Sequence, residues 1–189
     1  MTVTTLDPRT AFVVIDLQQG IAGIPAAAPL VAPLVANAAR LADAFRAADL
    51  PVVLVNVTGG APGRTERPRP ASPRDESWAD LLPELHPDAE GTLHVTKQTW
   101  GAFHSTDLDA RLRDAGVTQI VLAGIATSAG VESTARAAHE HGYNVTVATD
   151  AVGDMDPVNH EHSLTRVFPR LGETGTSDEI LDLLAATAR

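Results

Sequence analysis

The sequence predicts an α/β fold in which a parallel β-sheet carries helices on both faces. Short apolar runs typical of strands buried on both faces alternate with helical patterns along most of the chain. This alternation favours parallel pairing, because each crossover helix packs back onto a face of the sheet. The clearest example is the stretch 119–138, in which an apolar strand, a turn of small residues and a helix follow one another.

Composition restricts the kind of protein this can be. A chain of 189 residues with 44% apolar content suits one domain, 1–189, with a proper hydrophobic core. The absence of cysteine excludes disulfides, thiolate metal sites and thiol nucleophiles. A net charge of −10 argues against nonspecific binding to nucleic acid. Because we find no signal-peptide pattern and no apolar run of membrane-spanning length, we expect a cytoplasmic protein without a membrane partner.

The elements can be placed in order along the chain. A buried strand at 11–15 ends at Asp16, and further strands are predicted at 51–57, 92–96, 120–123, 144–149 and 171–174. Helical patterns cover 30–48, 78–85 as a short turn, 108–115, 128–138, 157–168 and the residues from 177 onward. The fourth strand is expected to end at Gly124. Residues 59–77 are too rich in glycine and proline for regular structure, and they form an unusually long connection.

Three features are predicted to meet at one edge of the sheet. In parallel α/β sheets, ligands bind beyond the carboxyl ends of the strands, where the strand order reverses. Asp16, Lys97 and the turn 124–130 all follow predicted strands. A carboxylate such as Asp16 is costly to bury without a partner, and Lys97 is the only lysine beside 13 arginines. A compact ammonium can pair with a carboxylate in a tight pocket. We therefore expect Asp16 and Lys97 to form an ion pair near Gly130, which offers no side chain.

The segments VVIDLQQGI, HVTKQTWGAF and GIATSAGVESTARAA resemble the isochorismatase-like hydrolases, a superfamily that also holds nicotinamidases and N-carbamoyl amidases. The resemblance covers nearly the whole chain. It implies a three-layer αβα fold with a six-stranded parallel sheet in the order 3-2-1-4-5-6. It also implies that Asp16 is the acid/base carboxylate and that Lys97 is its partner. The Ile125–Ala126 peptide is then expected to be cis, and the N–H groups of Ala126 and Gly130 to form an oxyanion hole.

The chain departs from the amidase members at one decisive position. Those members carry a nucleophilic cysteine where this sequence has Gly130, and the chain contains no cysteine. Hydrolysis through a cysteine acyl-enzyme is therefore excluded. Isochorismatases proper are similar in having glycine there. In those enzymes a carboxylic acid protonates a vinyl ether and water completes the hydrolysis.

No metal or other cofactor is expected. The nicotinamidase-type metal site needs an Asp-x-His pair after the second strand, and residues 56–60 supply no imidazole. His139 and His141 flank Glu140, and His160 and His162 repeat the pattern. Residues two apart on a helix do not share a face, so these pairs are poor metal sites.

A serine hydrolase is an alternative from a different mechanistic class. Residues 126–130 form a loose small-x-Ser-x-Gly elbow around Ser128, followed in order by Asp150 and by His160 or His162. This arrangement would leave Asp16 and Lys97 without a role. Ser128 is more simply interpreted as a helix N-cap.

Six residues are predicted to contact a substrate: Gln18, Trp78, Trp100, Phe103, Arg64 and Arg67. The rare aromatic residues after Lys97 can wall a pocket for a flat ring, although plain core packing is an equal alternative. The arginines of 59–77 can bring a guanidinium to an anionic substrate. A solvated loop or a subunit contact explains them equally well.

Taken together, the sequence predicts a cysteine-free hydrolase acting on a small, cyclic or carboxylated metabolite, in a homo-oligomer of two or four chains. The alternative is a catalytically degenerate member of the same fold that only binds a small molecule or another subunit. A degenerate site has no reason to keep a buried ion pair, which favours the enzyme.

Overall fold

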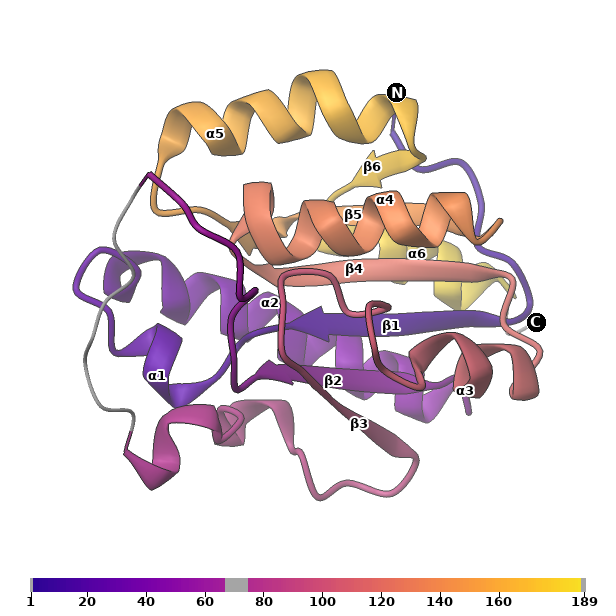
Figure 1. Cartoon of the computed structure of the whole chain (residues 1–189). Coiled ribbons are helices and arrows are strands. Elements are labelled where there is room, and N and C mark those ends of the chain that lie inside the picture. The colour runs from indigo at the N-terminus through magenta and orange to yellow at the C-terminus, as the bar shows by residue number, and fades with distance from the viewer. Residues whose placement is uncertain (1, 67–74, 188–189) are drawn as a thin grey trace.

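The computed structural model describes residues 2–66 and 75–187, and its centre is a six-stranded parallel sheet (Figure 1). The strand order is β3-β2-β1-β4-β5-β6, which confirms the predicted topology. The order reverses between β1 and β4, the point at which α/β sheets bind ligands. The strands are β1 Thr10–Ile15, β2 Val52–Val57, β3 Thr92–Lys97, β4 Gln119–Ile125, β5 Asn144–Gly153 and β6 Glu173–Gly175.

Helices cover both faces of this sheet. The α-helices are α1 Gln19–Ala22, α2 Ala28–Ala47, α3 Leu108–Asp114, α4 Glu132–Glu140, α5 Pro157–His162 and α6 Ser177–Thr187. Shorter 3-10 or π turns are η1 Glu76–Ala79, η2 Pro83–Leu85, η3 Thr127–Val131, η4 Ser163–Val167 and η5 Phe168–Arg170. Within the described residues, no helix is long and apolar enough to cross a membrane.

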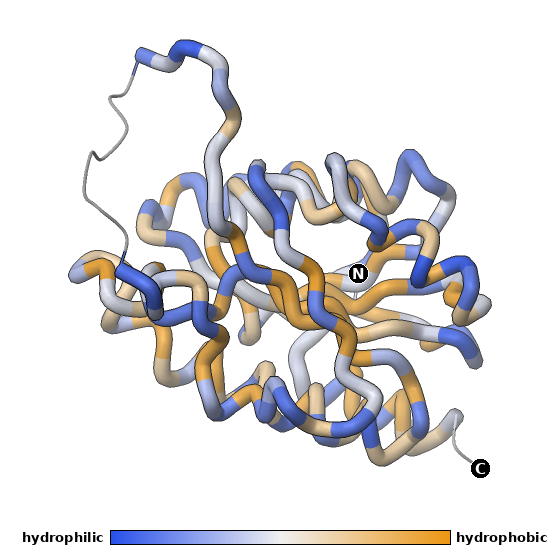
Figure 2. Tube along the Cα trace, turned by 60° about the horizontal axis from the view of Figure 1, so that its bottom comes forward, coloured by the Kyte–Doolittle hydropathy of each residue, from blue (hydrophilic) through white to orange (hydrophobic). Residues whose placement is uncertain are grey.

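The core consists of two apolar layers separated by the sheet, and β1 supplies both. Phe12 and Val14 face α2 and α6, and the Phe12 ring lies 5.4 Å from the ring of Phe45 in α2. Val13 and Ile15 face the other side, where α3 and α4 pack. A strand buried on both faces needs apolar residues at every position, which is why β1 reads as an unbroken hydrophobic run. Figure 2 shows the hydrophobic stretches gathered in the central strands.

Several strand ends differ from the prediction, and β6 covers Glu173–Gly175 instead of 171–174. Strand β4 continues through Gly124 to Ile125, because Gly124 adopts a φ of 121° and the β4–β5 register shifts there. Glycine reaches such a conformation without the steric cost of a side chain. Strand β5 runs to Gly153, so Asp150 lies inside the strand rather than at its end. The predicted helix 157–168 is observed as α5 followed by η4 and η5.

Candidate active site

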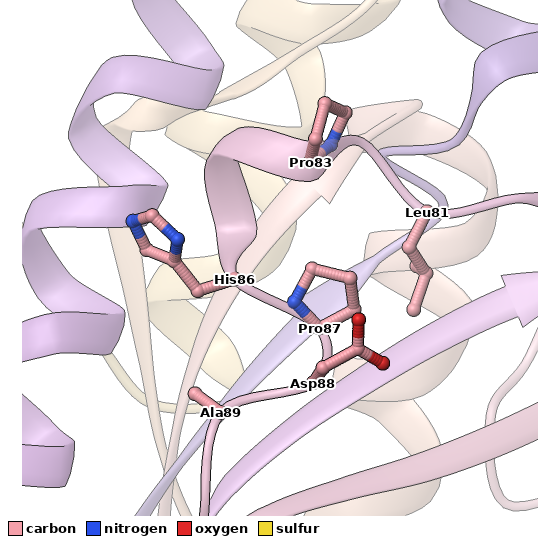
Figure 3. Close-up of a pocket in the computed structure, with 6 residues that line it drawn as sticks. All are labelled: Leu81, Pro83, His86, Pro87, Asp88 and Ala89. Carbon is pink, nitrogen blue, oxygen red and sulfur yellow. The ribbon is translucent and has the colours of Figure 1, made fainter.

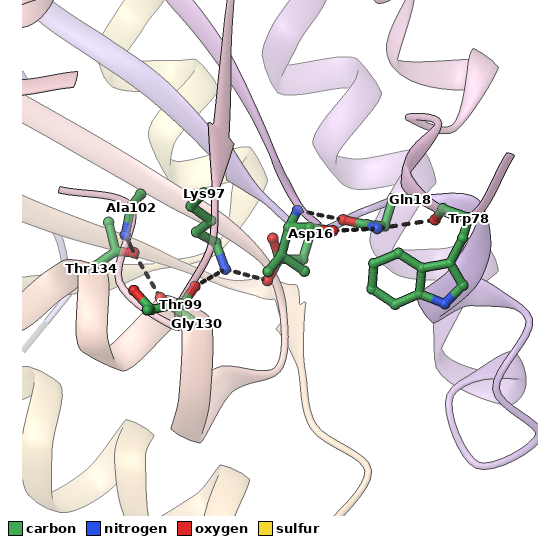
Figure 4. Close-up of polar contacts among 9 residues, drawn as sticks. Asp16, Gln18, Trp78, Lys97, Thr99, Ala102, Gly130 and Thr134 are labelled. Carbon is green, nitrogen blue, oxygen red and sulfur yellow. Dashed lines mark hydrogen bonds and ion pairs between the residues drawn. The ribbon is translucent and has the colours of Figure 1, made fainter. Parts of the chain in front are cut away.

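A buried ion pair joins two strands that are not neighbours in the sheet. Asp16 follows β1, Lys97 ends β3, and β2 lies between these two strands. The Lys97 Nζ atom lies 2.7 Å from Asp16 Oδ2, and the side chains point toward one another (Figure 4). The predicted Asp16–Lys97 contact is therefore present in the structure. It lies at the reversal point of the strand order, next to the turn that follows β4.

The backbone of Asp16 is fixed in a turn. Its N–H donates to the carbonyl of Val55 in β2, and its carbonyl accepts from the N–H of Gln18, each at 2.9 Å. Asp16 has a φ of 56°, in the left-handed region that aspartate tolerates better than most residues do. This conformation ends β1 and holds the carboxyl group at the edge of the sheet.

The two oxygens of the Asp16 carboxyl group have different surroundings. Oδ2 accepts from Lys97, whereas Oδ1 is the one buried side-chain oxygen of the described residues that has no hydrogen-bond partner. The residue is only 5% exposed. Burial raises the pKa of Asp16 to about 6, although the nearby Lys97 opposes this shift. Oδ1 is therefore able to hold a proton close to neutral pH.

Lys97 is held by a second contact. Its ammonium also donates to the carbonyl of Thr99 at 3.1 Å, and the side chain is 1% exposed. The structure thus accounts for the single lysine, because a buried ammonium with a carboxylate on one side and a carbonyl on the other needs a compact head group.

Gly130 lies directly against this pair. A Cβ atom at this position would lie 2.9 Å from Ile15 Cγ2 and 3.1 Å from Asp16 Oδ2, so any side chain there requires movement of its neighbours. The Ile125–Ala126 peptide is cis, as the resemblance implied. The carbonyl of Ala126 accepts from the N–H groups of Ala129 and Val131. An oxyanion hole formed by Ala126 and Gly130 stays a prediction.

Thr134 connects Gly130 with the segment after β3. Its hydroxyl donates to the Gly130 carbonyl at 2.7 Å and accepts from the N–H of Ala102 at 3.1 Å (Figure 4). Thr134 is fully buried. Thr134 lies within the predicted helical range 128–138, and no role was predicted for it from the sequence. The sequence signal that could have indicated a polar role is a threonine among the apolar residues of this helix.

The serine alternative is not supported by the geometry. Ser128 Oγ donates to Asp154 Oδ2 at 2.7 Å, and the Ser128 N–H donates to the same oxygen at 2.8 Å. Asp150 instead accepts from the N–H and hydroxyl of Ser177. His160 Nδ1 lies 2.9 Å from the Thr127 hydroxyl. The N-cap interpretation of Ser128 is wrong as well, because its hydroxyl donates to Asp154 and caps no N–H.

Two predicted substrate contacts have other roles. The amide of Gln18 is fully buried, where Nε2 donates to the carbonyls of Val57 and Trp78 and Oε1 accepts from the Val57 N–H. Both polar atoms of the Gln18 amide are thus hydrogen-bonded to backbone groups of Val57 and Trp78. The ring of Phe103 packs 5.1 Å from the His141 ring and 5.9 Å from the Tyr143 ring. Both neighbours lie just before β5, toward the opposite edge of the sheet, so Phe103 is a core residue.

Of the other four predicted substrate contacts, three lie within the described residues. Trp78 is partly buried, and its indole occupies the space into which a side chain at Gly20 would project. Figure 4 shows the indole on the Gln18 side of Asp16. Trp100 is 65% exposed, and Arg64 is exposed. Arg67 lies outside the described residues, as do the other arginines of this loop at 69 and 74.

The histidines of the two predicted pairs contact different partners. His139 Nδ1 pairs with the carbonyl of Leu171, whereas His160 pairs with Thr127. In the described part of the chain, no group of three or more histidine, aspartate or glutamate side chains could hold a metal ion.

Two surface hollows lie away from the ion pair. One, of about 500 Å³, is formed by the segment between η1 and β3 (Figure 3). Its lining residues are Leu81, Pro83, His86, Pro87, Asp88 and Ala89. The second, of about 840 Å³, includes Arg9 and Asp114, which precede β1 and β4. Neither is lined by Asp16, Lys97 or Gly130, and neither is lined by the buried carboxyl oxygen without a partner that the described residues contain.

Comparison with known proteins gives a consistent result. A family model described as the isochorismatase domain matches residues 10–179. The chain is 39% identical to the uncharacterized isochorismatase family protein YwoC of Bacillus subtilis, over 92% of this chain and 93% of the relative. It is 38% identical to the uncharacterized isochorismatase family protein YecD of Escherichia coli O157:H7, over 93% and 96% of the two chains. A solved isochorismatase family protein from Burkholderia thailandensis is similar with a TM-score of 0.90 and 39% identity, covering 97% of this chain and all of that one.

Proposed function

The chain belongs to the isochorismatase family of hydrolases, and on that premise we propose that it hydrolyses a small metabolite by proton transfer from Asp16. The observation that carries this proposal is the unpartnered, buried Oδ1 atom of Asp16. A buried polar atom without a partner is costly, and such atoms are rare outside sites that interact with something else. With its pKa raised to about 6, this carboxyl group suits proton donation near neutral pH.

The bond cleaved is proposed to be a carbon–oxygen bond of a vinyl ether. Asp16 Oδ1 donates its proton to the terminal vinyl carbon, which leaves an oxocarbenium ion and an Asp16 carboxylate. Water adds to the cation and returns a proton to the carboxylate. The resulting hemiketal releases an alcohol and a ketone. Lys97 stabilises the carboxylate that forms in the first step, because its ammonium is 2.7 Å away.

The lack of a nucleophile supports this route over an acyl-enzyme. The chain has no cysteine, and a side chain at Gly130 would crowd Asp16 Oδ2. Protonation of a vinyl ether needs no covalent intermediate, so glycine at this position leaves the mechanism intact. The proposed substrate is accordingly a small, cyclic or carboxylated molecule that carries a vinyl ether.

Binding without turnover is the second candidate function, and the missing cysteine favours it. Relative to a cysteine-dependent amidase the site has lost its nucleophile, while the ion pair could still bind a small molecule. The proposal therefore needs a test that separates catalysis from binding.

The test is Asp16→Asn, which keeps the shape and removes the proton. A panel of vinyl ethers, cyclic amides and esters is first screened on the parent protein, and the variant is then assayed with the best substrate. We expect kcat/KM to fall on the order of 10²–10⁴-fold or more. Full activity in Asp16→Asn overturns the proposal. If no compound is hydrolysed, but one raises the melting temperature of the parent protein and not of Asp16→Asn, the binding function replaces it.

A further inference from the structure

We propose that Thr134 is a positioning residue for the catalytic ion pair, acting through the segment 99–102 that follows β3. This inference rests on the proposed function, because it concerns the same Asp16–Lys97 pair. Thr134 contacts neither side chain of the pair in the hydrogen bonds of the structure. Its hydroxyl instead joins the two backbone segments that flank the pair.

The first link runs from Lys97 to the segment 99–102. The ammonium of Lys97 has three N–H groups, of which one donates to Asp16 and another to the Thr99 carbonyl. The Thr99 carbonyl therefore fixes the direction of the ammonium. Any displacement of residues 99–102 changes the position of this carbonyl and with it the geometry of the ion pair.

The second link runs from this segment to α4. The Ala102 N–H donates to Thr134 Oγ1 at 3.1 Å, and both residues are fully buried. The same hydroxyl donates to the Gly130 carbonyl at 2.7 Å, one helical turn earlier. The Trp100 carbonyl would lie 3.5 Å from a Cβ atom at Gly130, so the segment also packs directly against η3. One hydroxyl thus holds the segment against the turn that carries Gly130.

Removal of this hydroxyl leaves the Ala102 N–H buried without a partner. An unsatisfied buried N–H is costly, so the segment is expected to move until it finds water or another acceptor. Lys97 is the charged group that contacts Asp16 among the described residues, and it lowers the pKa of Asp16. If Lys97 moves away, the pKa of Asp16 rises. A merely structural role for Thr134 would not produce this change.

The experiment compares the pKa of Asp16 in the parent protein and in Thr134→Val. The pKa is read from the pH dependence of the side-chain carboxyl carbon resonance, which is assigned by its loss in Asp16→Asn. Valine keeps the branched shape and removes the hydroxyl. We expect the pKa of Asp16 to rise by up to about 1 unit, a fraction of the roughly 1–3 units that a close opposite charge supplies. Thr134→Ser keeps a hydroxyl and is expected to restore the parent value.

The matched control is Thr146→Val. Thr146 is another fully buried threonine, and its hydroxyl accepts from Gln119 Nε2 at 2.9 Å near the amino ends of the strands. This variant is expected to lose stability without changing the pKa of Asp16. If Thr134→Val does not fold, Thr134→Ala is measured in the same way, since the smaller side chain leaves space for a water molecule.

The inference is overturned by an unchanged pKa of Asp16 in folded Thr134→Val or Thr134→Ala. It is equally overturned if Thr134→Ser or Thr146→Val shifts this pKa as much as Thr134→Val does. The measurement needs no substrate, so its failure is distinct from failure of the proposed function. If the pKa shifts as expected while Asp16→Asn keeps full activity, the positioning role stands and the proposed mechanism fails.

Discussion

Two buried polar clusters lie at opposite edges of the sheet, and they differ in how completely their hydrogen bonds are satisfied. At the amino edge, Gln119 Oε1 accepts from the Asp7 N–H and the Thr10 hydroxyl, while Nε2 donates to the Thr5 carbonyl and the Thr146 hydroxyl. At the carboxyl edge, Asp16 Oδ1 has no hydrogen-bond partner among residues 2–66 and 75–187. Through these hydrogen bonds the first cluster holds residues 5–7 against β4 and β5.

This difference distinguishes a structural cluster from the cluster to which we assign the proposed function. A fully satisfied buried amide stabilises the fold and leaves nothing for a ligand to bind. A buried carboxyl oxygen without a partner reduces stability unless a substrate or proton occupies it. We therefore expect substitutions in the amino-edge cluster to change stability alone, and substitutions of Asp16 or Lys97 at the carboxyl edge to change activity and pH dependence.

The largest expected effect is that of Lys97→Met on activity. Without Lys97, the carboxylate that forms when Asp16 gives up its proton has no counter-ion in a buried site, so the pKa of Asp16 rises further. We expect kcat/KM on a substrate found by the screen to fall on the order of 10²–10⁴-fold. Arg40→Met is the control, because it removes a cation from an exposed ion pair with Asp178. Comparable losses in the two variants would show that the buried Asp16–Lys97 pair has no special role in activity.

The next effect concerns stability as a function of pH. Folding raises the pKa of Asp16 from 3.8 to about 6, so the native state binds more protons than the unfolded state between these values. Asp16 therefore contributes most stability below the lower value, and this contribution disappears as the pH rises through the upper one. The change corresponds to roughly 3 kcal/mol.

Urea unfolding across this pH range, in the parent protein and in Asp16→Asn, measures this contribution. The stability of the parent relative to the variant should fall as the pH rises. The slope is the relevant readout, because Asp16→Asn also deprives Lys97 of its counter-ion and so changes the absolute stability. Parallel curves would show that Asp16 has the same pKa in the folded and unfolded protein.

A smaller effect is expected for Gln119→Met at the amino edge. The change leaves the partly buried Asp7 N–H and the fully buried Thr146 hydroxyl without their partner. The expected cost is about 1–3 kcal/mol in the free energy of unfolding. Activity, measured well below the melting temperature, should remain at the parent level. A large loss of kcat/KM in the folded variant would contradict a purely structural role.

The smallest effect is expected for Ser128→Ala. The change removes one hydrogen bond to Asp154, which still accepts from the backbone N–H of residue 128. We expect a cost of about 1 kcal/mol in unfolding free energy and little change in kcat/KM. Abolished activity in this variant, together with retained activity in Asp16→Asn, would revive the serine mechanism.

The strands were predictable because their signals are local. A run such as that of β1 is apolar at every position since both faces of the strand are buried, and no long-range information is needed to read it. The order of the strands, by contrast, is not predicted by local signals. Alternating strands and helices indicate a parallel sheet, but the order 3-2-1-4-5-6 followed only from the resemblance to a known family.

The candidate site was predictable in part for the same reason. Parallel strands place their carboxyl ends at one edge, so Asp16, Lys97 and Gly130 were expected to meet there. The substrate contacts of Gln18 and Phe103 stay predictions, although both side chains make contacts inside the protein that local sequence does not reveal. The Gln18 amide turns toward the backbone of β2 and η1, and the Phe103 ring turns into the core.

The sequence by itself determined the fold class, the edge at which Asp16 and Lys97 meet, and the exclusion of a cysteine nucleophile. Only the tertiary structure decided which polar atoms are satisfied and which are left free. The Thr134 hydroxyl accepts from the N–H of Ala102, 32 residues away, and Asp16 Oδ1 is without a partner because no polar group of the described residues reaches it. Hydrogen-bond satisfaction depends on the positions of atoms distant in sequence, so composition and periodicity cannot encode it.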